Sequence, residues 1–168
     1  MINVERNFLE LRDLKNLRHN SINQTKFLIK KIEPDFQLNK FFYKQVGKNH
    51  RWIDRLSWSN EKWIKYISNK NLETYVITNS KDPVGFFELL YHPLLKETEI
   101  SYFGLLEEYI GKGIGGYALS EAIKKSFEKN INRVWLHTCT LDHPNALKNY
   151  IARGMTVFKK ENINILDS

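Results

Sequence analysis

A cluster of four glycines within residues 111–116 constrains the fold of this chain more than any other feature of its sequence. Glycine inside a helix costs about 1 kcal/mol relative to alanine, so the cluster favours a tight turn with bare backbone. A strand-like run over residues 100–106 precedes the turn, and apolar residues at helical spacing follow it over 117–127. Free backbone amides therefore gather at a helix start, and this arrangement predicts an anion site that suits phosphate.

The composition fits one globular domain in a reducing compartment. The chain has 168 residues, of which 42% are hydrophobic and 13% aromatic, enough for a sizeable core. The net charge of +7 favours anionic partners or a basic solvated surface, and the scattered lysines and arginines form no tract that predicts a nucleic-acid partner. A lone cysteine, Cys139, excludes an internal disulfide. No secretory h-region or membrane-length run is present, so we expect a cytoplasmic protein without a membrane partner.

Before the glycine cluster, the pattern predicts strands and two helices. For residues 4–11 a helix is an alternative to the strand. Three consecutive strands joined by short turns indicate an antiparallel meander. The expected strands cover residues 4–11, 26–32, 73–79, 84–91 and 100–106, and the expected helices cover 36–46 and 60–68, the second capped by Ser59.

After the cluster we expect a helix over 115–129 with Asn130 as its C-cap, and then a strand over 133–139. Because a helix separates them, strands 100–106 and 133–139 should be parallel neighbours. A further helix should begin at residues 142–145, with Asp142 or His143 near its cap, and a last strand should cover 155–158.

Two motifs of this second half resemble those of the GCN5-related N-acetyltransferases (GNAT). The acyl-CoA loop of that family reads Gln/Arg-x-x-Gly-x-Gly/Ala, and residues 110–115 match it with Ile110 at the first position. The second motif is Asn-x-x-Ala-x-x-x-Tyr-x-x-x-Gly-Phe. It is matched at Ala146, Tyr150, Gly154 and, with Met for Phe, Met155, whereas His143 replaces the first asparagine.

Other functions stay open at this stage. Residues 111–116 also fit G-x-G-x-x-G, the dinucleotide fingerprint. However, four residues separate the glycines from their strand, and Leu136 and His137 stand where an acidic residue is expected. An NAD(P)-binding protein is therefore one alternative, and a non-catalytic module that binds nucleic acid or the ribosome through its basic charge is another.

The GNAT resemblance implies an α/β fold with a mixed, mostly antiparallel, V-splayed central sheet flanked by helices. Residues 1–168 would form one N-acetyltransferase domain, with 1–70 as the variable substrate side and 73–158 as the acetyl-CoA-binding core. Acetyl-CoA would be the co-substrate, with no metal. The residues implied in cofactor binding are Phe103, Gly104, Leu105, Ile110, Gly111, Lys112, Gly113, Ile114, Gly115, Gly116, His143, Asn145 and Asn149.

The resemblance also implies direct acetyl transfer to a primary amine. Glu99 lies where histone-modifying members carry a general base, with Glu88 and His137 as rivals, and Tyr150 matches the general acid that protonates the leaving thiolate. The acceptor would be a small-molecule or peptide amine, and a homodimer is compatible with the family. Aromatic faces attract cations, so the candidate substrate-binding residues are Trp52, Asp54, Trp58, Glu88 and His137.

Overall fold

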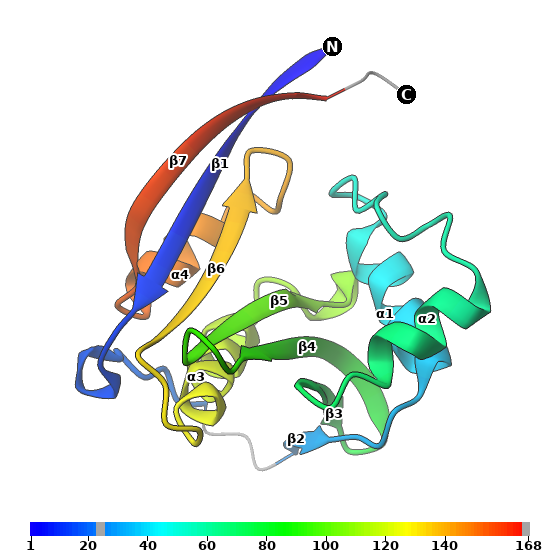
Figure 1. Cartoon of the computed structure of the whole chain (residues 1–168). Helices are drawn as coiled ribbons and strands as arrows, with labels where there is room; N and C mark the ends of the chain where they lie inside the picture. Colours follow the sequence, from blue (N-terminus) through cyan, green and yellow to red (C-terminus); the bar gives the residue numbers. More distant parts are fainter. Residues whose placement is uncertain (23–25, 166–168) are drawn as a thin grey trace.

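The computed structural model describes residues 1–22 and 26–165, which form a mixed α/β domain around a seven-stranded sheet (Figure 1). Two short 3-10 helices cover Leu14–Asn16 and Glu107–Tyr109. The strands are β1 (Ile2–Leu11), β2 (Phe27–Lys31), β3 (Leu72–Asn79), β4 (Asp82–His92), β5 (Glu97–Leu105), β6 (Arg133–Cys139) and β7 (Thr156–Ile165). The α-helices are α1 (Phe36–Gly47), α2 (Asn60–Ile67), α3 (Ile114–Ser126) and α4 (Ala146–Ala152).

The sheet is divided into two wings, the first formed by β2, β3, β4 and β5 and the second by β6, β1 and β7. Its order is β2-β3-β4-β5-β6-β1-β7, and β5–β6 is the parallel pair among otherwise antiparallel neighbours. This parallel pair holds only over Glu97–Glu99, opposite Arg133–Trp135. Beyond that point the two strands diverge, as Figure 1 shows, so the predicted V-splayed, mostly antiparallel fold is confirmed.

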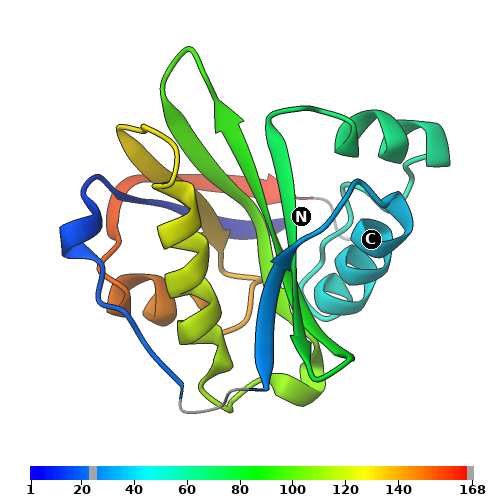
Figure 2. The same cartoon turned by 90° about the horizontal axis from the view of Figure 1, so that it is seen from below.

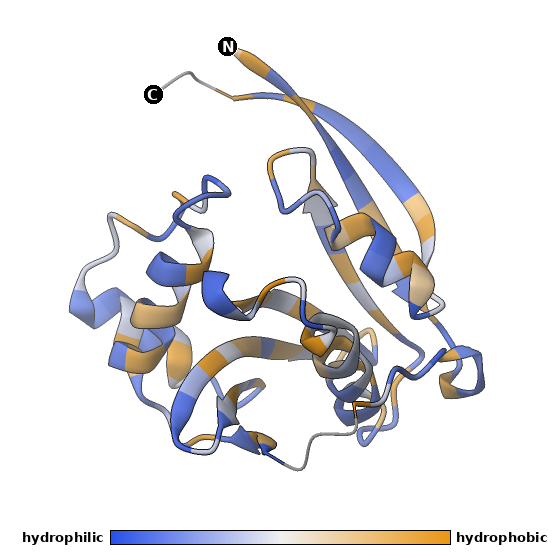
Figure 3. Ribbon diagram, turned by 180° about the vertical axis from the view of Figure 1, so that it is seen from behind, coloured by the Kyte–Doolittle hydropathy of each residue, from blue (hydrophilic) through white to orange (hydrophobic). Residues whose placement is uncertain are grey.

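The first strand lies in the interior of the second wing. β1 pairs antiparallel with β6 on one side and with β7 on the other, although both partners come more than 120 residues later in the chain. Val4, Leu9 and Leu11 are buried on β1, which explains why the segment is a strand and not the alternative helix. Figure 3 shows a hydrophilic stretch along β7, the outer strand of this wing.

Helices cover the sheet on both sides (Figure 2). α3 packs on one face of the β2–β5 wing and α1 and α2 on the other, while α4 lies behind β6 and β1 in Figure 1. The main core lies between α3 and the sheet. It includes Ile77 and Phe87 of the sheet and Leu119 and Ile123 of α3, all of them fully buried. None of the helices in the described ranges is long and apolar enough to cross a membrane.

Several local predictions are confirmed, and two helix boundaries are wrong. Ser59 caps α2 by accepting the Lys62 N–H at 3.2 Å, as predicted. Helix α3 ends at Ser126 and not at Asn130, because Phe127 already closes its last turn. Helix α4 begins at Ala146, and the carboxylate of Asp142 turns back to β6 instead of capping it.

Candidate active site

A cleft of about 670 Å³ opens where β5 and β6 part. One wall is β5 from Glu99 to Leu105, and the other is formed by Leu136, His137 and Cys139 of β6. The rest of the lining comes from the glycine loop (residues 110–116), from α4 and from the segment between α1 and α2. The cleft therefore exists because pairing between these two strands stops after three residues.

The glycine loop has the geometry that its composition predicts. Gly111 and Gly113 adopt φ values of 81° and 80°, in the left-handed region where other residues are strained. Gly113 is the N-cap of α3, and no side chain of the described residues caps this end. The first amides of α3, which as in any helix have no intrahelical partner, are therefore without a side-chain partner as well. A Cβ at Gly111 or Gly113 would meet no atom within 4 Å, which leaves open space for a ligand against the backbone.

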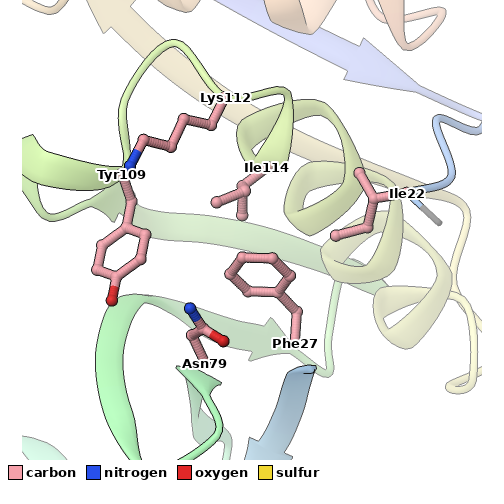
Figure 4. A pocket seen from close by; sticks show the side chains of 6 residues that line it. All are labelled: Ile22, Phe27, Asn79, Tyr109, Lys112 and Ile114. Carbon is pink, nitrogen blue, oxygen red and sulfur yellow. The ribbon is translucent and has the colours of Figure 1, made fainter. Parts of the chain in front are cut away.

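The loop residues divide between two cavities. Ile110, Gly111, Gly115 and Gly116 line the cleft. Lys112 and Ile114 line a separate cavity of about 250 Å³ beside β2, shown in Figure 4. The Lys112 ammonium lies 5.5 Å from the centre of the Tyr109 ring, so this cation points away from the cleft.

Both candidate catalytic side chains line the cleft. Tyr150 of α4 is 8% exposed and packs edge-on against Phe103, with ring centres 6.5 Å apart. Burial, and then the Asp142 carboxylate, raise the pKa of its phenol. Glu99 is the last residue of β5 that pairs with β6, and its Oε2 lies 3.0 Å from His92 Nε2. This arrangement offers a neutral proton donor and a carboxylate in one cleft.

His137, the rival base, also lines the cleft. Its ring lies 5.5 Å from that of Phe8. Burial, and then the positive charge of Arg6, lower the pKa of its imidazole, so it is neutral near pH 7 and able to accept a proton.

The loop between β6 and α4 contacts the opposite wing through Asp142. Its carboxylate accepts hydrogen bonds from Thr138 Oγ1 at 2.6 Å and from the Cys139 amide at 3.0 Å, which fix it to the end of β6. It also accepts one from Trp52 Nε1 at 3.4 Å, across the cleft. Beside this contact, the rings of His50 and His143 lie 5.9 Å apart. Thus two loops, one from each wing, meet over the cleft.

Most of the other predicted site residues line the cleft. Those that line it are Phe103, Gly104, Leu105, His143, Asn145, Asn149, Trp52 and Asp54. Trp58 does not line it, because its ring packs against Trp63 and Tyr66.

Glu88, which the sequence predicts as a substrate-binding residue or rival base, also lies outside the cleft lining. Its side chain is fully buried and both oxygens lie 3.2 Å from Arg55 Nη1. Tyr66 donates to it at 2.7 Å and Asn39 at 2.8 Å. The carboxylate thus holds Arg55, and the guanidinium in turn lies 4.2 Å from the centre of the Tyr102 ring on the cleft wall.

Comparison with known proteins identifies the family. The model of the acetyltransferase (GNAT) family matches residues 33–155. The chain belongs to the GNAT family. No curated protein matches the chain.

Solved GNAT structures share the fold. A GCN5-related N-acetyltransferase from Sphaerobacter thermophilus superposes with a TM-score of 0.70 at 15% identity, over 94% of this chain and 49% of that protein. One from Kribbella flavida gives 0.63 at 14%, over 91% and 54%. An aminoglycoside acetyltransferase, meta-AAC0020, from an uncultured soil metagenomic sample gives 0.66 at 14%, over 85% and 96%. The chain thus spans about half the length of the first two proteins.

Sequence reasoning missed residues that come from distant segments. Val4 and Arg6 of β1, together with Ile163 and Ile165 of β7, line the cleft because β1 inserts beside β6. No local pattern signals that insertion. Asp142 was predicted near a helix cap, and its position directly after β6 was the available signal for a role at the cleft.

Proposed function

We propose that this GNAT protein transfers the acetyl group of acetyl-CoA directly to a primary amine. The observation that carries the proposal is a single cleft with uncapped helix amides in its lining and both Tyr150 and Glu99 on its walls. The amides suit the diphosphate of CoA, since they are donors at the positive end of a helix. The unpaired edges of β5 and β6 suit the amides of the pantetheine arm.

The chemistry needs three proton transfers. Glu99 takes a proton from the ammonium form of the acceptor, directly or through water, and the free amine attacks the thioester carbonyl. The new C–N bond forms and the C–S bond breaks, and the thiolate takes the proton of the Tyr150 phenol. The positively charged nitrogen of the product then loses its extra proton, directly or through water, to the Tyr150 phenolate, which restores the phenol. Burial keeps the phenol protonated until the thiolate forms.

Isothermal titration calorimetry with acetyl-CoA and with CoA tests the cofactor, and NADH serves as the comparison ligand. We expect binding of both CoA species and none of NADH; no heat with either CoA species at millimolar concentration would remove the proposal. A thiol-release assay over a panel of small amines and peptides then tests the acceptor. Tyr150→Phe should lower kcat while the Kd for acetyl-CoA stays near that of the wild type, and an unchanged kcat would refute the role of this phenol.

A further inference from the structure

Arg153, at the C-terminal end of α4, lies against the first turn of α3. A Cβ added to Gly116 would overlap both Arg153 Nη1 and Asn20 Nδ2. Gly116 is the third residue of α3 and lines the cleft. Two nitrogen donors from segments more than 130 residues apart therefore converge beside the glycine loop.

The charge of Arg153 has no counter-charge among the described residues. Its Nε is buried without a hydrogen-bond partner, and burial alone lowers the pKa of its guanidinium. Arg55 is paired with Glu88, and Arg133 with Glu10 and Glu97, whereas Arg6 on the cleft wall, like Arg153, has a buried Nε without a partner. Leaving a partly buried charge without a partner is unfavourable, and a bound anion would relieve this cost.

The position of Arg153 next to the amino end of α3 makes its unpaired charge more unfavourable. The amino end of a helix carries partial positive charge, which disfavours a nearby cation. Lys112, the cation of the glycine loop, is turned toward Tyr109 and offers no charge on the cleft side. The first turn of α3 thus combines uncapped amides, an unpaired guanidinium and a side-chain amide, and an anion bound there would satisfy all three.

We propose that Arg153, with Asn20 beside it, binds a phosphate group of CoA next to the glycine loop. The inference rests on the proposed function, since it assigns the anion to the cofactor. CoA carries a diphosphate and a 3′-phosphate, and both are anions that accept hydrogen bonds from such donors. A side chain at position 116 would then displace both donors.

The test compares Kd values for CoA and 3′-dephospho-CoA in the wild type, Arg153→Met and Lys148→Met. Lys148 is an exposed cation on the same helix, so its variant controls for net charge. Arg153→Met should weaken CoA binding by roughly 10-fold to 100-fold, the size expected for a hydrogen bond between charged groups. If Arg153 holds the 3′-phosphate, dephospho-CoA binding will be unchanged by the substitution, and if it holds the diphosphate, both ligands will weaken.

Thermal unfolding gives a second readout that a merely structural role would not produce. Without ligand, Arg153→Met should be at least as stable as the wild type, because it removes an unpaired cation, whereas the rise in Tm caused by saturating CoA in the wild type should shrink. Equal Kd values for CoA in the wild type and Arg153→Met would overturn the inference alone. Absence of CoA binding to the wild type would instead overturn the proposed function.

Discussion

The buried pair between Glu88 and Arg55 allows a quantitative prediction. Glu88→Gln would remove the negative charge from a fully buried position and leave the Arg55 side chain, itself only 7% exposed, without its counter-ion. Removing one partner of a buried ion pair costs about 3–5 kcal/mol. Because glutamine still accepts one hydrogen bond from Tyr66 or Asn39, we expect the lower end, about 3 kcal/mol. For a chain of this size that corresponds to a fall in Tm of roughly 6–12 °C.

Urea unfolding measures this cost, and Glu107→Gln is the matched control. Glu107 pairs with Lys48 at 3.5 Å but its side chain is 67% exposed, so its loss should cost less than about 1 kcal/mol. Adding Arg55→Met to Glu88→Gln should cost less than the sum of the single variants, because neither charge is then left unpaired. A loss below about 1 kcal/mol for Glu88→Gln, or additive effects in the double variant, would refute this reasoning. A raised KM for the acceptor with unchanged stability would restore Glu88 as a substrate-binding residue.

Three further predictions concern the cleft. Gly113→Ala should cost about 1–2 kcal/mol in urea unfolding because its φ is +80°, whereas Gly115→Ala, at an ordinary φ, should cost less. Because burial raises the pKa of Tyr150, a kcat profile should show its alkaline limb above pH 10, the value of a free tyrosine, and a limb below pH 10 would contradict its role as the acid. Glu99→Gln should lower kcat/KM by about 10²–10⁴ if Glu99 is the base, with a loss that shrinks as pH rises and more amine is already deprotonated; an effect confined to His137→Gln would move the role to that residue.

What the sequence predicts well is local. The glycine cluster specified a turn and a helix start with open space beside it, because positive φ and missing side chains are properties of glycine itself. Ser59 specified the start of α2 because its hydroxyl accepts a hydrogen bond from an amide only three residues away.

What the sequence does not predict depends on distant partners. Glu88 stands among apolar residues of β4, and that pattern fits a ligand-binding carboxylate as well as a paired one. Its partner, Arg55, lies 33 residues away in a segment without regular structure. The position of β1 between β6 and β7 is likewise set by pairing across more than 120 residues. Arg153 and Asn20 meet at Gly116 only because the fold brings their segments together.

The opening of the cleft follows from how its two strands are held. β6 pairs with β5 at three positions but with β1 at six, so the later part of β6 follows β1 away from the first wing. β5 stays with β4, with an extra residue at Ser101 that shifts the register between them. Farther along β5, Gly104 packs so closely on Val46 of α1 that a Cβ would overlap it, which fixes the strand to the helix side. Each strand is therefore secured on its outer side, and the backbone groups that face the cleft remain available to a ligand.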